Sequence, residues 1–186
     1  MMRLKLWTIP LLLLFLAPAI STPVYASLFP EVVDTLEIES FMGRWYEIAS
    51  TQPSEQKDCI CTTADYASID DKTFGITNSC RKKTIDGMLD IREGKAKLTR
   101  NPGKIKVTFD GDHFPFFSNY WIVDLAADYR YVVITTGLKK PIWILARSQS
   151  LNQEDMGGIL NRLHRDYYNL TKLRLTHQIG CQHSEI

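Results

Sequence analysis

The side chains of this 186-residue chain that could bind a metal ion or act as nucleophiles include four cysteines and four histidines. A soft metal site would combine the Cys59-x-Cys61 pair with three residues near the end of the chain: His177, Cys181 and His183. Zinc sites usually separate their paired cysteines by two to four residues, so this spacing argues against a metal. His113 and His164 also lie outside any hydrolase motif of the GxSxG or HExxH type. The sequence therefore predicts no catalytic residue, no metal and no cofactor.

Disulfide formation is the chemistry that the cysteines fit best. Cys59, Cys61, Cys80 and Cys181 form an even set, as expected of an exported protein in an oxidising compartment. A bond between Cys59 and Cys61 would be badly strained, because the two residues are neighbours on one face of a strand. Two pairings remain open. The estimated register of the hairpin places Cys80 nearly opposite Cys61, which favours joining those two.

Residues 1–26 are typical of a secretory signal peptide. Arg3 and Lys5 supply a basic start, residues 11–17 a short apolar core, and Val24-Tyr25-Ala26 a cleavage site. The apolar run is short for a membrane span of about 20 residues. No cysteine near the cleavage site could carry a lipid. We therefore expect residues 27–186 to be exported as a soluble domain without a lipid anchor, either to the periplasm or to the extracellular space.

The composition indicates one globular domain, since 45% of the residues are hydrophobic and the formal net charge is only +1. That charge argues against nucleic-acid binding. Eight short β-type segments follow one another, separated by turn residues. They span residues 44–49, 62–69, 74–81, 88–98, 104–109, 120–125, 130–136 and 141–148. This pattern favours an up-and-down barrel or a sandwich.

Helical periodicity occurs in one later segment, where Met156, Ile159 and Leu163 fall on one face. Ser150 or Asn152 is suited to cap the start of this helix. We also expect a short helical turn within residues 29–42 and a last strand over residues 173–178. The apolar face of the helix should pack on the outside of the strands.

Three motifs resemble those of the lipocalin family and occur in the family's order. Gly43-Arg44-Trp45 resembles the first motif, Gly-x-Trp. Ala127-Asp128-Tyr129 resembles the second, Thr-Asp-Tyr, with Ala in place of Thr. Arg147, at the end of the segment Trp-Ile-Leu-Ala-Arg, resembles the arginine of the third, and a helix follows it as in the family. The resemblance covers residues 27–186 and is strongest to the apolipoprotein D, bacterial lipocalin and chloroplast lipocalin branch.

The resemblance implies an all-β fold, an eight-stranded antiparallel up-and-down barrel with a C-terminal α-helix packed on its outside. It gives a structural role to five residues: Gly43, Trp45, Asp128, Tyr129 and Arg147. Trp45 would close the narrow end of the barrel, with the Arg147 guanidinium stacked on its ring. The resemblance also implies the disulfides Cys59–Cys80 and Cys61–Cys181, which is the pairing that the hairpin register does not favour.

A barrel of eight strands leaves room inside for one small ligand. If Arg147 turns inward, strand alternation turns Leu145 and Trp143 inward as well. Alternation and the family pattern give the other predicted ligand-binding residues: Ile105, Val107, Phe109, Tyr120, Ile122, Tyr131, Val133 and Thr135. The aromatic residues Phe114, Phe116 and Phe117 should form a lip at the open end, contact a membrane transiently, or fold back over the barrel.

The predicted function is the binding and transport or storage of a small hydrophobic ligand, a fatty acid or a lysophospholipid. Two alternatives remain open: a lipocalin-type enzyme acting on a lipid or carotenoid, and a protein-binding module that uses the open end. The predicted partner is the lipid ligand and not a nucleic acid. The sequence is compatible with a monomer or a dimer.

Overall fold

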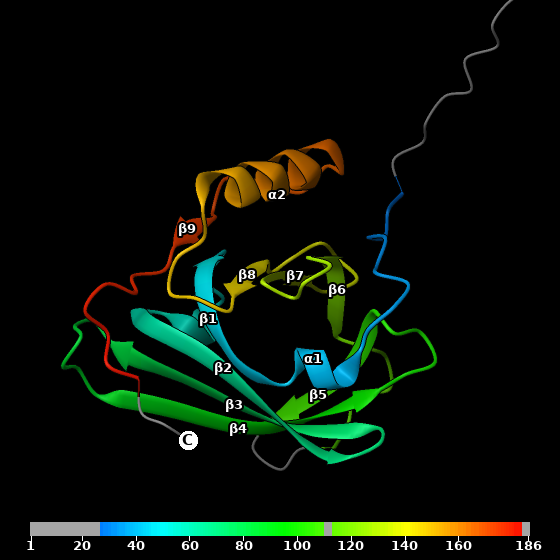
Figure 1. Cartoon of the computed structure of the whole chain (residues 1–186), viewed down its shortest axis with the longest axis horizontal. Helices are drawn as coiled ribbons and strands as arrows, with labels where there is room; N and C mark the ends of the chain where they lie inside the picture. Colours follow the sequence, from blue (N-terminus) through cyan, green and yellow to red (C-terminus); the bar gives the residue numbers. More distant parts are fainter. Residues whose placement is uncertain (1–26, 110–112, 184–186) are drawn as a thin grey trace, which may run out of the picture.

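The structure, a computed structural model, describes residues 27–109 and 113–183. The predicted signal peptide, residues 1–26, lies outside the described residues. Within them, strands dominate and two α-helices flank the sheet (Figure 1). The strands are β1 (Gly43–Ser50), β2 (Cys59–Asp70), β3 (Thr73–Lys82), β4 (Leu89–Leu98), β5 (Lys104–Phe109), β6 (Tyr120–Leu125), β7 (Tyr131–Thr135), β8 (Trp143–Ala146) and β9 (Arg174–Leu175). The helices are α1 (Ile38–Phe41), the 3₁₀ turn η1 (Ser54–Gln56) and α2 (Gln153–Arg165).

Strands β1 to β8 form a closed antiparallel barrel in which each strand pairs with the next one along the chain. Pairing of β1 with both β2 and β8 closes the ring, with Trp45 opposite Ala64 and Tyr46 opposite Ala146. The predicted up-and-down barrel is therefore confirmed. The expected last strand over residues 173–178 is only the two-residue β9, which pairs with β1 outside the ring.

The barrel has a closed end and an open end. In an up-and-down sheet, alternate connections between strands lie at the same end of the barrel. The β1–β2, β3–β4, β5–β6 and β7–β8 connections share the open end. Helix α1 lies at the other end, where Phe41 and Trp45 are fully buried. Their rings are 5.5 Å apart, and Phe41 also lies 5.3 Å from the ring of Tyr66. These aromatic contacts fill the closed end.

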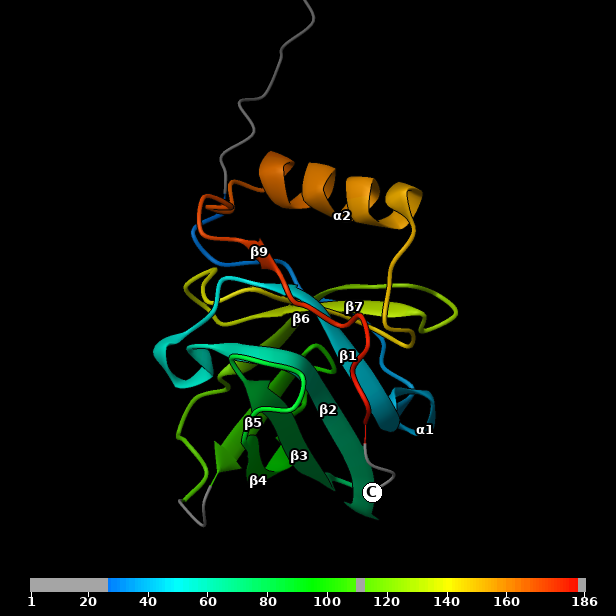
Figure 2. The same ribbon diagram turned by 90° about the vertical axis from the view of Figure 1, so that its left-hand side faces the viewer.

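Helix α2 packs across the outside of the barrel (Figure 2). The side chain of Asn152 accepts a hydrogen bond from the backbone of Asp155, so Asn152 is the N-cap. On the buried face, Ile159 and Leu163 form a second apolar cluster with Ile48 and Ile144 of the barrel wall. This contact confirms the predicted placement of the C-terminal helix. Among the described residues, no helix has the length and apolarity to cross a bilayer.

Two disulfides join Cys59 to Cys80 and Cys61 to Cys181. This is the pairing that the resemblance implies. The estimated register holds, since Cys80 lies opposite the β2 residues between Ile60 and Thr63, but the Cys61–Cys80 bond that it favoured does not form. The reason is a β-bulge between Ile60 and Thr63 of β2. At the bulge the Cys61 backbone has a positive φ of 53°, and its N–H donates to the carbonyl of His177 in the C-terminal tail. Cys61 therefore pairs with the tail rather than with β3.

Candidate functional site: the barrel cavity

A cavity of about 1030 Å³ fills the open half of the barrel. Its apolar wall consists of side chains from the inner faces of six strands: Ala64, Tyr66, Ile76, Val107, Tyr120, Ile134 and Leu145. Its polar wall comprises Glu47, Gln56, Thr62, Asn78, Asp90, Arg92 and Asn119. On β2 and β3 the polar residues lie nearer the open end than the apolar ones. The cavity therefore grades from an apolar floor to a polar mouth.

The floor of the cavity ends at a pair of tyrosines. The hydroxyls of Tyr66 and Tyr120 are 2.9 Å apart. Burial raises the pKa of Tyr66 to about 12, and it raises the pKa of Tyr120 well above its ordinary value. Both phenols are therefore neutral at physiological pH and satisfy one another's hydrogen bonds without adding charge to the floor.

Below this pair, Arg147 seals the closed end. Its guanidinium lies 3.7 Å from the centre of the Trp45 ring. It donates hydrogen bonds to the carbonyls of Arg44, at 2.8 Å, and Ser40, at 2.6 Å. Burial lowers the pKa of Arg147 below its ordinary value. These contacts tie the segment before β1 to the end of β8, so the geometry gives Arg147 the structural role that the motif implies.

The second motif contributes to the same end. The Tyr129 hydroxyl accepts a hydrogen bond of 2.7 Å from the backbone N–H of Glu37, in the segment before α1. Asp128 accepts from the backbone of Arg130 at 3.2 Å. Gly43 has a positive φ of 88° where the chain turns into β1, a conformation that glycine adopts without strain. The motif residues thus lie at or near the closed end, where Tyr129 and Arg147 bond to the segment before β1 and Asp128 bonds within the β6–β7 turn.

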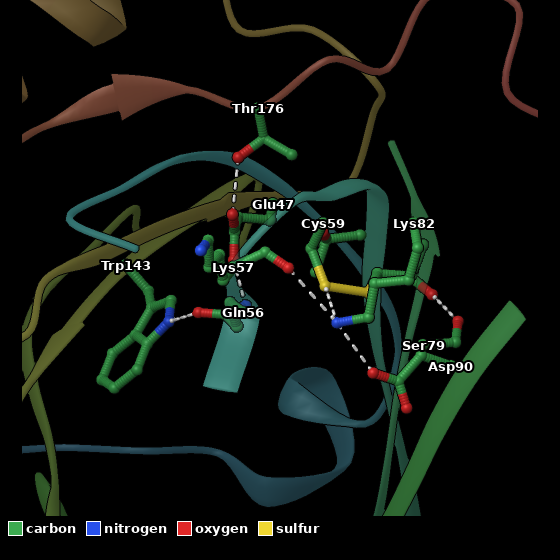
Figure 3. The surroundings of a disulfide bond; sticks show 12 residues. Glu47, Gln56, Lys57, Cys59, Ser79, Lys82, Asp90, Trp143 and Thr176 are labelled. Carbon is green, nitrogen blue, oxygen red and sulfur yellow. Dashed lines mark hydrogen bonds and ion pairs between the residues drawn. A yellow bond between two sulfur atoms is a disulfide. The ribbon is translucent and has the colours of Figure 1, made fainter. Parts of the chain in front are cut away.

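A hydrogen-bonded chain of polar side chains borders the mouth (Figure 3). The buried Glu47 carboxylate accepts from the Thr176 hydroxyl at 2.5 Å and from the Gln56 amide at 2.8 Å. The Gln56 carbonyl in turn accepts from the Trp143 indole N–H at 2.7 Å. Burial raises the pKa of Glu47, an effect that its hydrogen bonds only partly offset. This series of hydrogen bonds links the β1–β2 connection to β8 and to the C-terminal tail.

The Cys59–Cys80 disulfide also lines the cavity near its mouth. The Lys82 ammonium lies 3.3 Å from the Cys59 sulfur and 2.9 Å from the Asp90 carboxylate (Figure 3). All four cysteine sulfur atoms are in disulfides, so Cys59, Cys61 and Cys181 offer no free thiolate to the metal site that their spacing with His177 and His183 brought into question.

The structure places the predicted ligand-binding residues in three different environments. Five of them line the cavity: Val107, Phe109, Tyr120, Trp143 and Leu145. Ile105 and Ile122 also face inward but are fully buried in the core cluster at the closed end rather than in the cavity wall. The remaining three, on β7, are wrongly oriented.

The prediction that Tyr131, Val133 and Thr135 face the cavity is wrong. Tyr131 and Val133 lie in the outer cluster beneath α2, and the Thr135 hydroxyl donates to the Pro141 carbonyl. The inward residues of β7 are Val132 and Ile134, which pair with the inward residues of β8. Every residue of β7 is buried, because one face contacts the barrel interior and the other contacts the helix side. Hydrophobic alternation therefore could not distinguish the two faces.

Sequence reasoning also missed the polar wall. On β4, Asp90 and Arg92 line the cavity, whereas Leu89 and Ile91 are 40% and 51% exposed. In most strands the hydrophobic residues face the interior, but on β4 they face solvent. The hydrophobic periodicity of β4 therefore indicated Leu89 and Ile91 as inward residues instead of Arg92. Its guanidinium lies 5.1 Å from the centre of the Phe109 ring, another cavity residue.

Of the aromatic residues in the β5–β6 connection, Phe114 is half-buried, whereas Phe116 and Phe117 do not fold back over the barrel. Phe116 and Phe117 are 84% and 77% exposed, and their rings contact each other edge-on at 4.8 Å. The described residues that line the cavity do not include them. Their roles as a lip or a membrane contact stay predictions.

Comparison with known proteins places this geometry in a family. The family model of the lipocalin-like domain matches residues 36–178, which include all eight barrel strands and α2. The chain belongs to the lipocalin family. Curated relatives of this lipocalin include temperature-induced lipocalin-1 of Arabidopsis thaliana, 30% identical over 80% of this chain and 82% of the relative. Outer membrane lipoprotein Blc of Escherichia coli is 28% identical over 80% and 83%, and mouse apolipoprotein D 26% identical over 82% of each chain.

Solved structures agree with the fold. Insecticyanin from the tobacco hornworm Manduca sexta has a TM-score of 0.64 and 22% identity, covering 88% of this lipocalin and 92% of the insecticyanin chain. Lobster apocrustacyanin A1 has a TM-score of 0.58 and 21% identity over 75% and 78% of the two chains. Lipocalins generally bind small hydrophobic molecules, so the cavity is the candidate ligand site of this chain.

Proposed function

We propose that this lipocalin carries or stores a single-chain amphipathic lipid, a fatty acid or a lysophospholipid. The observation that carries the proposal is the cavity itself. Its volume of about 1030 Å³ lies at the upper end of the range for small-molecule sites, about 300–1,000 Å³. Its apolar floor suits an acyl chain, because burying each methylene group stabilises a complex by about 0.8 kcal/mol.

The acidic head of such a lipid would lie in the polar mouth, with Arg92 as its cationic partner. Arg92 lines the cavity, and guanidinium groups bind carboxylates and phosphates through paired hydrogen bonds. Fatty acids and lysophospholipids share this chemistry, a long chain that ends in an anion. The proposal includes no chemical step.

We also propose that the protein is exported and works in a periplasm or outside the cell. The support is the predicted signal peptide, residues 1–26, together with two disulfides, which persist in oxidising compartments.

Titration of the delipidated protein with oleate tests the proposed function, with quenching of Trp143 fluorescence as the signal. We expect saturation at one oleate per chain and loss of most of the quenching in Trp143→Phe. Arg92→Gln should weaken oleate binding about tenfold or more, the usual effect of losing a charged hydrogen bond. Arg81→Gln is the matched control, because Arg81 neighbours Cys80 on β3 and does not line the cavity.

A flat titration curve would contradict the carrier function. Equal oleate affinities of Arg92→Gln and Arg81→Gln would contradict the placement of the acidic head at Arg92. A lysophospholipid in place of oleate distinguishes a carboxylate from a phosphate head.

A further inference from the structure

Two buried polar atoms near Glu47, Thr62 Oγ1 and Gln178 Oε1, lack a hydrogen-bond partner among the described residues, and Thr62 also lines the cavity. Pairing of β1 with β2 reaches only Tyr46 and Thr63, and beyond this point the C-terminal tail fills the gap between the strands. The Gln178 amide donates to the backbone carbonyls of Glu47, at 2.9 Å, and Thr62, at 2.8 Å. The tail therefore holds these side chains in one cluster, and the disulfide from Cys61 anchors it there.

Thr62 and Gln178 are only 6% and 4% exposed. Among the described residues, no group forms a hydrogen bond with Thr62 Oγ1 or with Gln178 Oε1. Folded proteins leave few buried polar atoms in this state, and those few deserve an explanation. Thr62 lines the cavity together with Glu47, and alternation along β2 puts it on the same inner face as Ala64.

The chemistry of the cluster selects against a charged group. Burial raises the pKa of Glu47 and so favours its neutral acid. A threonine hydroxyl both donates and accepts, as does a protonated carboxyl, and an amide oxygen accepts. A hydroxyl group is the complementary partner, because it also donates one hydrogen bond and accepts others.

We propose that Thr62 and Glu47, backed by Gln178, form a second polar subsite that binds a hydroxyl group of the ligand. The subsite rests on the proposed lipid-carrier function and refines it. Arg92 would hold an acidic head, whereas Thr62 and Glu47 select lipids that carry a free hydroxyl near the head, as the glycerol of a monoacyl lipid does. Thr62 and Glu47 are then specificity-determining residues.

Two neutral lipids with the same acyl chain, 1-oleoylglycerol and methyl oleate, test the subsite without involving Arg92. We expect the wild-type protein to bind the glycerol ester about five- to tenfold more tightly, the effect of one or two net hydrogen bonds. Thr62→Val keeps the shape of the side chain and removes its hydroxyl, so this preference should fall to about twofold or less. Thr63→Val is the matched control, because the Thr63 hydroxyl already pairs with Ser79 at 2.8 Å.

The ligand-free variants supply a second readout. Because no described group bonds to Thr62 Oγ1, Thr62→Val should not lower the Tm of the apoprotein, whereas Thr63→Val should lower it. A lower Tm for ligand-free Thr62→Val would overturn the inference, since it would show that the hydroxyl is satisfied without a ligand. Equal binding of the two lipids by the wild-type protein would also overturn it and leave the carrier function intact. If neither lipid nor oleate binds, the carrier function fails together with the subsite.

Discussion

Replacing Arg147 should destabilise the closed end by an amount that the structure allows us to work out. In Arg147→Met the protein loses hydrogen bonds to the carbonyls of Ser40 and Arg44 and the stacking on Trp45. A hydrogen bond to a charged group contributes about 1.5–3 kcal/mol, and a cation–π contact about 0.5–1 kcal/mol when exposed. Because Arg147 is half-buried and its bond to Ser40 is exposed, values slightly below the lower ends of these ranges apply. We expect a loss of about 3 kcal/mol in the free energy of unfolding.

Urea and thermal unfolding, followed by circular dichroism, measure this loss. For a domain of this size, about 3 kcal/mol corresponds to a Tm lower by about 6–12 °C. Arg147→Lys keeps the charge above Trp45 but can form only part of the hydrogen-bond pattern, so its loss should be about half as large. If Arg147→Met unfolds within about 0.5 kcal/mol of the wild type, the arginine does not hold the closed end together and the reasoning is refuted.

Three further predictions concern the tail, the helix and the cavity wall. Because the Cys61–Cys181 disulfide spans 120 residues, Cys61→Ser/Cys181→Ser should lower the free energy of unfolding by about 2–5 kcal/mol; an unchanged urea midpoint would contradict this. Ile159→Ala should cost about 2–5 kcal/mol because Ile159 is fully buried between α2 and the barrel, and a cost below 1 kcal/mol would mean that the helix is not docked there. The raised pKa of Glu47 means that the folded protein holds its proton more tightly than the unfolded chain, so the stability of the wild type relative to Glu47→Gln should fall as the pH rises above about 4.5. Urea unfolding of both proteins across that range checks the sign, and parallel curves would contradict it.

The strands could be predicted well from alternation because most of them have one solvent-facing side, whereas the choice of a barrel over a sandwich came from the lipocalin motifs. On β5, Ile105 and Val107 alternate with half-buried lysines, and the structure buries the two apolar residues as expected. The capping residue of α2, Asn152, could also be predicted, because its side chain needs only a local backbone N–H. Local chemistry and alternation are sufficient where one face of an element contacts water and the other packs in an apolar core.

The cavity itself was harder to predict, because residues that line a hollow interior can be polar although they face inward. Arg92 faces inward while Ile91 faces solvent, so the hydropathy of β4 indicates the wrong face. On β7 both faces are buried, and Val133 and Ile134 look alike to any hydropathy pattern. Gln56 lies in a connection and reaches Glu47 only through the tertiary fold, so no sequence spacing could predict this contact.

The central claim is that one acyl chain lies inside the barrel, and a variant that fills the cavity tests it most directly. Ala64 lines the cavity on the inner face of β2, so Ala64→Phe would place a ring in the space of the chain. We would refold wild type and variant with a mixture of oleate and lysophospholipid, remove unbound lipid, and quantify the bound lipid by native mass spectrometry. The account predicts one lipid per wild-type chain and little or none in a folded Ala64→Phe. Equal lipid content in the two proteins, or none in either, would contradict it.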